Sequence, residues 1–268
     1  MKTEKISKMH TPKERRTLES IFGPWEETII WSCLQGVMGE LYSNCPRYDA
    51  GMAILGDFAF YAGKPCRELL LLNPQRYRQD FLIQVPQNAA WAELIEECYG
   101  THAKKVSRYA LKKEKDVFDQ AKLQQAVAQL AEGYSLRLLT QEEYRLCQNN
   151  RWAGDLVSQF PDYSAYQKLG IGVVVLKDGE LVAGASSYSS YNGGIEIEVD
   201  TRSDHRRKGL AYACAAKLIL ECLERKWYPS WDAQNLWSVA LAEKLGYHYS
   251  HTYTAYEITG SPIVRHCM

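Results

Sequence analysis

The spacing of apolar and polar residues changes its period within one stretch of the chain, residues 195–223. From Ile195 to Thr201 apolar and acidic residues alternate strictly, as they do in a strand with one buried face. After Gly209 the apolar residues follow a helical stripe instead, made up of Leu210, Ala211, Cys214, Ala215, Leu218, Ile219, Cys222 and Leu223. The pattern therefore predicts a strand, a short turn and then a helix.

The turn between the two periods is basic and carries a glycine, since it reads Arg206-Arg207-Lys208-Gly209-Leu210-Ala211. The first N–H groups of a helix have no partner inside it and lie at the positive end of its dipole, so such a turn can bind an anion. Gly209 lets a ligand approach the backbone, and three basic side chains suit a ligand with several phosphates. An ordinary connection between a strand and a helix, with solvated basic residues and no ligand, would show the same pattern.

The elements around this stretch follow from the same reasoning. A strand is expected at residues 135–139, followed by a helix that Thr140 caps. A hairpin is expected over residues 170–188, because Asp178-Gly179 lies between two apolar runs. Asn235 to Gly246 has a helical pattern, and an alternating run follows it. This order of strands and helices predicts a mixed α/β fold around a central sheet.

The N-terminal half contains a weak repeat of the C-terminal pattern. Asn88 begins a helical segment that stops at Gly100 and precedes a strand, just as Asn235 and Gly246 bound a helix that precedes a strand. The basic glycine turn has no counterpart in this half, which is therefore expected to bind no cofactor. The expected domains are a degenerate N-terminal copy of the fold over residues 1–112, a linker helix over 113–132 and the complete domain over 133–268.

Two motifs resemble the GNAT superfamily of N-acetyltransferases. The turn from Arg206 to Ala211 fits the superfamily's Gln/Arg-x-x-Gly-x-Gly/Ala sequence, whose backbone N–H groups hold the pyrophosphate of acetyl-CoA. The stretch from Trp231 through Asn235 to Tyr247 looks like the next strand and helix of that fold. The whole chain looks most like a bacterial two-part type within this superfamily, with a degenerate GNAT-like N-terminal domain.

The resemblance implies a GNAT fold, in which helices flank a central, mixed and splayed sheet, and it implies acetyl-CoA (coenzyme A) as the cofactor. In this superfamily the cofactor lies where the fourth and fifth strands splay apart, and a backbone N–H near Val199 is expected to polarise the thioester carbonyl. Asn235 and Ser238 are expected to contact the cofactor, but a helix cap for Asn235 and a surface hydroxyl for Ser238 explain these residues equally well. The residues expected to contact the cofactor are Val199, Asp200, Thr201, Arg206, Arg207, Lys208, Gly209, Leu210, Ala211, Asn235 and Ser238.

Acetyl transfer to an amine needs a group that takes a proton from the amine. Glu196 and Glu198 are the catalytic candidates, because they share a strand face with Asp200 and some members of the superfamily carry a carboxylate on this strand. Three carboxylates on one face are expected to raise one another's pKa. Glu196 is the first choice because it lies further from the phosphate turn, and a solvated strand face is the plain alternative.

The chain departs from the superfamily at Ala242, where many members have a tyrosine that protonates the thiolate leaving group. Tyr247 or Tyr249 from the next strand could replace it, or water could do so. His205 could act as a base, but on a polar turn it is expected to be solvated. Two functions stay open: an acetyl-CoA-dependent N-acetyltransferase in which a small-molecule amine attacks directly, and a non-catalytic module that binds acyl-CoA or regulates through protein interaction.

Composition narrows the partners and the location. Lys plus Arg equals Asp plus Glu at 32 each, so no overall field draws the chain to nucleic acid or to an anionic membrane. The cysteines show neither a Cys-x-x-Cys pair nor the Cys/His spacing of a zinc site, so no metal is expected. The sequence shows no signal peptide and no transmembrane run, which predicts a cytoplasmic protein, and it is compatible with a homodimer.

Overall fold

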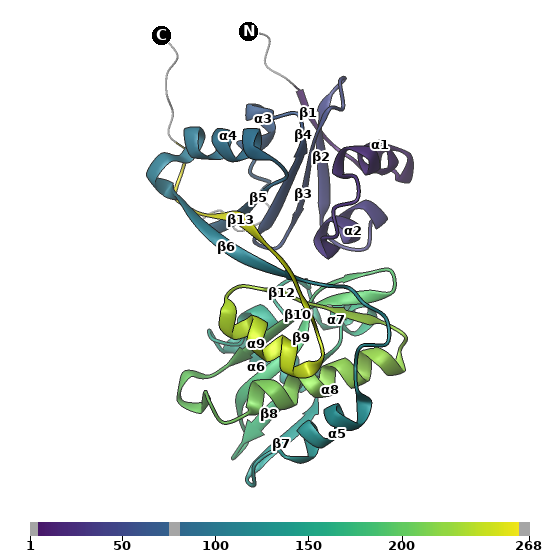
Figure 1. Cartoon of the computed structure of the whole chain (residues 1–268), viewed down its shortest axis with the longest axis vertical. Helices are drawn as coiled ribbons and strands as arrows, with labels where there is room; N and C mark the ends of the chain where they lie inside the picture. Colours follow the sequence, from purple (N-terminus) through teal and green to yellow (C-terminus); the bar gives the residue numbers. More distant parts are fainter. Residues whose placement is uncertain (1–4, 75–80, 263–268) are drawn as a thin grey trace. The chain divides into compact units, whose positions relative to one another are not determined.

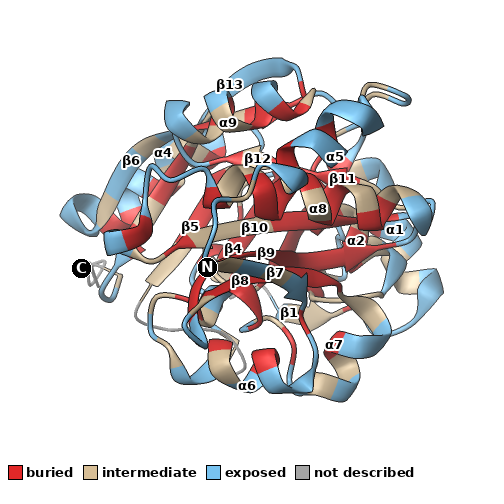
Figure 2. Ribbon diagram, turned by 90° about the horizontal axis from the view of Figure 1, so that it is seen from below, coloured by how far each residue is buried: buried red, intermediate tan, exposed pale blue. Residues whose placement is uncertain are grey.

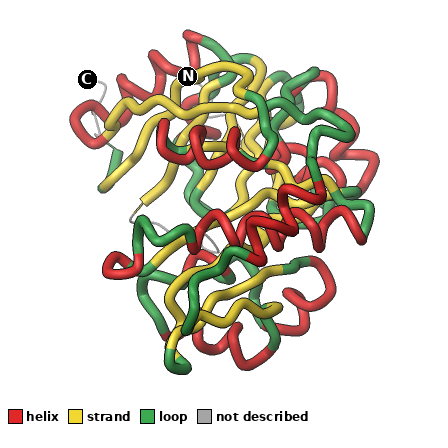
Figure 3. Tube along the Cα trace, turned by 60° about the horizontal axis from the view of Figure 1, so that its bottom comes forward, coloured by secondary structure: helices red, strands yellow, loops and turns green. Residues whose placement is uncertain are grey.

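The computed structural model describes residues 5–74 and 81–262, and its chain divides into two compact units (Figure 1). Unit 1 consists of Met1–Arg108 with Tyr253–Met268, and unit 2 consists of Tyr109–Thr252. Each unit combines strands with helices that lie beside them (Figure 3). Residues 1–4, 75–80 and 263–268, the last range including Cys267, lie outside the described residues.

Unit 2 is built on a five-stranded sheet with the order β11-β10-β9-β8-β7. Neighbouring strands are antiparallel from β7 to β10, whereas β10 and β11 run parallel. The elements of this unit are α5 (Gln120–Ala128), β7 (Tyr134–Leu138), α6 (Gln141–Asn149), η2 (Gly154–Leu156), α7 (Tyr163–Leu169), β8 (Gly172–Lys177), β9 (Glu180–Tyr191), β10 (Gly194–Thr201), η3 (Ser203–His205), α8 (Leu210–Glu224), β11 (Tyr228–Ser230), β12 (Asp232–Ala233) and α9 (Leu236–Leu245).

The predicted strand, turn and helix are β10, η3 with the residues after it, and α8. Ile195 and Ile197 of β10 are buried in one core together with the apolar stripe of α8, as the two periods predicted. Figure 2 shows that much of β10 and α8 is buried. Glu221 on α8 lies outside the apolar stripe, yet it is also buried, with 6% of its surface exposed. Its carboxylate is neutralised by Lys217 and Arg225, at 2.6 and 2.8 Å.

The opposite face of this sheet is covered by η2 and α7. Two glycines permit this close packing. A Cβ at Gly172 would lie 2.3 Å from the hydroxyl of Tyr166, and a Cβ at Gly184 would lie 2.6 Å from Leu156. Because Gly184 is the strand partner of Asp200, η2 reaches the sheet beside this carboxylate.

The helix expected as a linker, α5, is part of unit 2. Leu123 and Ala126 are only 1% and 5% exposed and belong to the same core as α8, beside which α5 lies in Figure 1. The helix thus covers an apolar stripe of α8 that would otherwise face water. Periodicity predicted that these residues form a helix but not which surface the helix would cover.

The parallel strands β10 and β11 pair only at their first residues. Gly194 to Glu196 face Tyr228 to Ser230, and then β12 pairs instead with the end of β6, where Asp232 lies opposite Ala110. Within the described residues, β10 after Glu196 pairs with β9 alone. The two strands therefore splay apart, as the resemblance implied.

Unit 1 shows the same order of elements around its own sheet. Strands β1 to β4 are antiparallel neighbours in sequence, and β5 lies parallel to β4. Two helices follow the first strand and one helix follows the fourth, as in unit 2. The elements are β1 (Lys5–Lys8), α1 (Pro12–Phe22), α2 (Thr28–Gln35), β2 (Glu40–Cys45), β3 (Ala50–Leu55), β4 (Phe58–Gly63), α3 (Arg67–Leu70), β5 (Phe81–Pro86), α4 (Ala89–Tyr99), η1 (Gly100–His102) and β6 (Ala103–Leu111).

The last strand, β13 (Tyr249–Thr259), changes the predicted boundaries. Its end from Tyr256 to Thr259 pairs with β5 and belongs to unit 1, whereas the expected second domain contained all residues to the C-terminus. Tyr256 and Ile258 are buried in the core of unit 1, which gives this segment its place there. Likewise β6 crosses into unit 2 after Arg108, before the predicted boundary at residue 112. Strand pairing decides these boundaries.

The cysteines within the described ranges are all free. Cys214 and Cys222 are fully buried on α8, which confirms that they are small core residues. In the part of the chain that the structure describes, no cluster of metal-ligating side chains occurs. No helix in residues 5–74 or 81–262 has the length and apolar character needed to cross a bilayer.

Candidate functional site

Unit 2 contains a cavity of about 700 Å³ at the start of α8. It lies where the end of β10, the basic turn and parts of α5, α8 and α9 meet. Its lining residues are Lys122, Val199, Asp200, Thr201, His205, Arg206, Arg207, Gly209, Leu210, Ala211, Tyr212, Leu241 and Lys244. Of the residues expected to contact a cofactor, all but Lys208, Asn235 and Ser238 are therefore brought together.

The turn before α8 holds two residues in the left-handed backbone region. Arg207 has a φ of 60° and Gly209 a φ of 78°. A side chain is strained at such a φ, which explains the glycine at position 209. A Cβ on Gly209 would meet no atom of the described residues within 4 Å, so the space over this backbone is open. The strained conformation at Arg207 is typical of ligand-binding turns.

The first turn of α8 offers free N–H groups to this open space. The first helical bond runs from the Ala213 N–H to the Gly209 carbonyl at 3.1 Å, and no side chain caps the helix. The N–H groups of Leu210, Ala211 and Tyr212 consequently have no acceptor inside the helix, and all three residues line the cavity. Together with the helix dipole they make a position that suits an anion.

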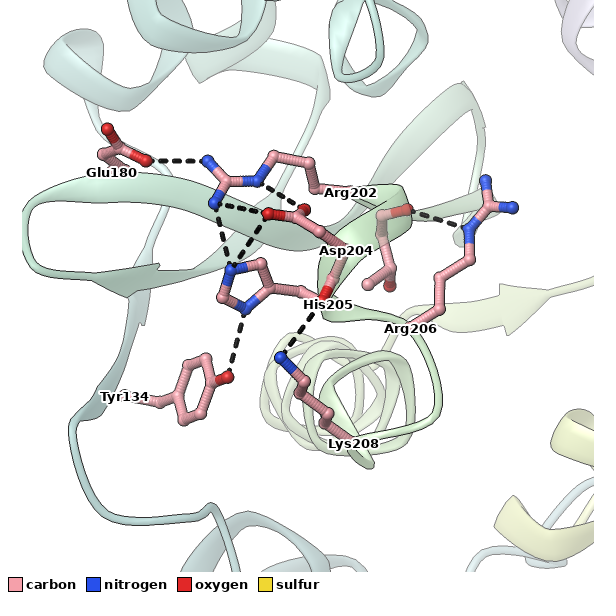
Figure 4. A network of polar contacts seen from close by, with 8 residues as sticks. Tyr134, Glu180, Arg202, Asp204, His205, Arg206 and Lys208 are labelled. Atoms are coloured by element: carbon pink, nitrogen blue, oxygen red, sulfur yellow. Dashed lines mark hydrogen bonds and ion pairs between the residues drawn. The ribbon is translucent and has the colours of Figure 1, made fainter.

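Arg202 connects this turn to the rest of the sheet (Figure 4). Its guanidinium donates to Glu180 at the start of β9 and to Asp204, both at 2.8 Å. It also lies 3.0 Å from Nε2 of His205, whose Nδ1 lies 3.0 Å from the hydroxyl of Tyr134 on β7. The network thus fixes η3, the segment that leads into the turn, against two strands.

His205 is a buried member of this network, with 8% of its surface exposed, and not the solvated side chain that the sequence suggested. A guanidinium can only donate, so Nε2 of His205 accepts from Arg202. In the neutral ring Nδ1 then carries the proton and donates to Tyr134. The geometry therefore selects one tautomer of the uncharged imidazole.

The basic side chains of the turn have different roles. Arg206 donates from Nε to the Thr201 carbonyl at 3.3 Å, which closes the turn onto β10. Lys208 donates to the Asp204 carbonyl at 3.0 Å and does not line the cavity. Arg207 lines the cavity, and no partner for its guanidinium occurs in the described part of the chain.

The end of β10 forms the other wall of the cavity. Burial raises the pKa of Asp200. The negative charge of Asp155 on η2 raises this pKa further, whereas the positive charge of Arg206 lowers it. The sequence had attributed such a shift to neighbouring carboxylates on the strand. Thr201 is 8% exposed, and its hydroxyl has no hydrogen-bond partner within residues 5–74 and 81–262. A buried polar atom without a partner is costly, which favours a polar ligand here.

Glu196 lies at the point where β10 and β11 separate. Its Oε1 accepts the backbone N–H of Asp232 at 2.6 Å, and 9% of its surface is exposed. The carboxylate thus replaces the strand partner that Asp232 loses at the splay. Glu198 is half-buried further along the same strand. Neither glutamate lines the cavity itself.

Asn235 and Ser238 both have structural partners. Oδ1 of Asn235 accepts from the Ser238 N–H at 3.0 Å and caps α9, as the plain interpretation predicted. The Ser238 hydroxyl accepts from the indole N–H of Trp231 at 3.1 Å, so it is more than a surface hydroxyl. These contacts fix the start of α9 beside β12.

Tyr247 and Tyr249, considered as proton donors to the thiolate because position 242 is an alanine, lie outside the cavity. Tyr247 is 2% exposed and donates to the Pro229 carbonyl at 2.5 Å, and burial raises its pKa well above the usual value. Tyr249 is exposed and contacts Thr252. Neither one lines the cavity, and Tyr212 is the tyrosine that does.

Sequence reasoning missed four lining residues: Lys122, Tyr212, Leu241 and Lys244. Tyr212 could have been found, because it follows the motif within the first turn of the predicted helix. Leu241 and Lys244 lie three residues apart and so share a face of the predicted helix α9. No local signal identified Lys122, because its position depends on the packing of α5 against α8.

Comparison with known proteins gives consistent results. The family model described as GNAT acetyltransferase matches residues 19–256. A GCN5-related N-acetyltransferase-like protein from Streptococcus suis is 45% identical and has a TM-score of 0.87, over 93% of this chain and 100% of that one. A GNAT-family acetyltransferase from Novosphingobium aromaticivorans shares the fold, with 18% identity and a TM-score of 0.53, over 94% of this chain and 100% of that one.

A shorter similarity is found to the uncharacterized N-acetyltransferase YdfB of Bacillus subtilis. The two proteins are 35% identical over 95 residues, which are 35% of this chain. The matched part spans 36% of the length of that relative.

Proposed function

This chain belongs to the GNAT acetyltransferase family and is an acetyltransferase, and from that premise we propose that it transfers the acetyl group of acetyl-CoA to a small-molecule amine. The observation that carries the proposal is the cavity in which the uncapped start of α8 meets the free edge of β10. Its volume of about 700 Å³ lies within the usual range for small-molecule sites. A cytoplasmic location belongs to the same proposal.

The residues present fit coenzyme A. The free N–H groups at Leu210, Ala211 and Tyr212, with Arg206 and Arg207 beside them, suit the pyrophosphate. The backbone of Val199 and Asp200, which has no strand partner on the β11 side within the described residues, suits the amides of the pantetheine. The Thr201 N–H already donates to Oδ1 of Asp200 and the Thr201 carbonyl accepts from Arg206, so Thr201 offers its unpartnered hydroxyl. The amide nitrogen of Asn235 and the hydroxyl of Ser238 complete the proposed contacts at the start of α9, and Gly209 keeps the approach open.

Acetyl-CoA would supply the activated thioester, and coenzyme A would leave as the thiol. In the proposed direct attack, the amine nitrogen forms a bond to the carbonyl carbon, and the carbon–sulfur bond then breaks. The Val199 N–H, at the splay, polarises the carbonyl oxygen. The proton lost by the amine passes to the Glu196 carboxylate, with Glu198 as the second candidate, and the thiolate takes its proton from water.

Thiol release from acetyl-CoA over a panel of amines tests this proposal. Glu196→Gln is expected to lower kcat by about 100-fold or more, as loss of a general base does, while acetyl-CoA still binds. Glu198→Gln tests the second candidate on the same strand, and an equal or larger fall in kcat for this variant would assign the proton transfer to Glu198. Gly209→Trp places a large side chain in the open space over the turn and is expected to abolish the rise in Tm that acetyl-CoA causes, a stabilisation of about 2.7 kcal/mol at 100 times Kd.

Three results would each overturn part of the assignment. If wild type binds acetyl-CoA but acetylates no amine, the acceptor class is wrong. If Gly209→Trp retains the rise in Tm, the phosphate site lies elsewhere. Full activity of Glu196→Gln would remove that residue from the mechanism.

We also propose that unit 1 is a degenerate copy of the fold of unit 2. Its strands have the same order and directions as those of unit 2, with helices at corresponding places. At the place of α8, however, the described residues of unit 1 contain the single turn α3, Arg67–Leu70, and residues 75–80 lie outside them. We therefore assign cofactor binding to unit 2 alone.

A further inference from the structure

The cavity is lined by more positive charge than one pyrophosphate needs. Its charged lining residues are Lys122, Asp200, Arg206, Arg207 and Lys244. Arg206 closes the turn onto β10 and lies near the Asp200 carboxylate, so these two charges offset each other. Three cations therefore remain on the wall without a compensating carboxylate among the lining residues.

These three cations come from three different elements. Arg207 belongs to the turn, Lys122 to α5 and Lys244 to α9. In the described part of the chain, no hydrogen bond or ion pair involves the side chains of Lys122 and Lys244. By contrast, Lys217 on the neighbouring α8 is paired with Glu221. Unpaired cations that line one cavity from separate elements favour an anionic ligand.

Packing fixes the backbone at both lysines, whose exposed side chains line the cavity. Lys122 directly precedes Leu123, which is 1% exposed in the core of unit 2, so the core fixes this turn of α5. Lys244 precedes Leu245, which is likewise 1% exposed at the end of α9. The unpartnered hydroxyl of Thr201, 92% buried on the same wall, independently points to a polar ligand.

Coenzyme A carries two separate anionic groups, the pyrophosphate and a 3′-phosphate on its ribose. The monoester carries about −1.5 to −2 charges at pH 7 and accepts several hydrogen bonds. The turn and the free N–H groups of α8 account for the pyrophosphate. We propose that Lys122 and Lys244 form a second anion subsite that binds the 3′-phosphate and selects coenzyme A over 3′-dephospho-coenzyme A. This inference rests on the proposed function.

The experiment compares the Kd values of coenzyme A and 3′-dephospho-coenzyme A by titration calorimetry. Wild type is expected to prefer coenzyme A by about tenfold or more, as loss of charge-assisted hydrogen bonds implies. Lys122→Gln with Lys244→Gln is expected to remove this preference and to leave the Kd of the dephospho compound unchanged. Lys168→Gln, on exposed α7 away from the cavity, is the control for a loss of positive charge.

The outcomes separate the inference from the proposed function. If wild type binds both compounds equally, or if the double variant weakens both equally, the subsite does not exist although the cofactor assignment stands. If wild type binds neither compound, the proposed function itself fails. Arginine at both positions is expected to retain the preference, since it keeps the charge.

Discussion

At the residue scale, the conformation of the phosphate turn depends on side chains outside the motif. Arg202 and Tyr134 are not part of the Arg206–Ala211 sequence, yet with His205 they fix the segment that leads into it. The motif predicts free N–H groups. The network decides where these groups point.

Replacing His205 tests this role. His205→Phe removes an acceptor for Arg202 and a donor to Tyr134, so we expect KM for acetyl-CoA to rise by about tenfold and kcat to change little. His205→Gln keeps one acceptor and one donor and is expected to restore most of the affinity. Steady-state kinetics with both variants measures this difference, and equal KM values for the two would contradict the assigned hydrogen bonds.

Asp200 gives a pH-dependent prediction. Burial raises its pKa in the folded chain, so between the unfolded and folded pKa values the folded state binds more protons than the unfolded state. Its contribution therefore favours folding at low pH and is lost as the pH rises through the raised pKa. Asp200→Asn is expected to lack this decline, which urea unfolding at a series of pH values measures against wild type. An identical pH slope in both proteins would show that Asp200 is not perturbed.

At the scale of elements, α5 contributes both to stability and to the site. Leu123 packs into the core, while the preceding Lys122 lines the cavity. The helix thus couples the wall of the cavity to the core of unit 2. Its sequence alone gave the helix but suggested a linker.

Leu123→Ala tests the structural part of this role. Truncating a buried leucine leaves a cavity and is expected to lower the free energy of unfolding by about 2–5 kcal/mol. Gln125→Ala on the exposed side of the same helix is the control, with an expected change within about 0.5 kcal/mol. Chemical denaturation measures both values. Similar stability of the two variants would mean that α5 does not belong to the folded core.

At the scale of the whole molecule, strand pairing makes the stability of unit 1 depend on the end of the chain. Residues 256–259 of β13 pair with β5, and Ala255, Tyr256 and Ile258 are buried. Unit 1 is therefore discontinuous in sequence. If the chain were divided into two consecutive segments between residues 108 and 109, β13 would be separated from β5, with which it pairs.

A chain that ends at Thr252 is expected to lose this pairing. Burial of Tyr256 and Ile258 contributes about 1.5–3 kcal/mol each, so the amides of β5 should lose much of their protection from hydrogen exchange. A chain that ends at Ser261 retains β13 and is the control. Mass spectrometry of a peptide covering β5 measures the effect, and equal protection in both chains would show that β13 does not support unit 1.

The sequence by itself determined the periods of β10 and α8, the glycine turn between them and the cap at Asn235, because each depends on residues close together in the chain. Through the resemblance it also indicated a mixed sheet whose fourth and fifth strands splay apart. Only the tertiary structure decided what packs against these elements. It buries His205 and Glu221, places Lys122 on the cavity wall and pairs β13 with β5. Local patterns specify which face of an element is apolar, whereas the surface that covers this face is selected by packing between residues that are distant in sequence.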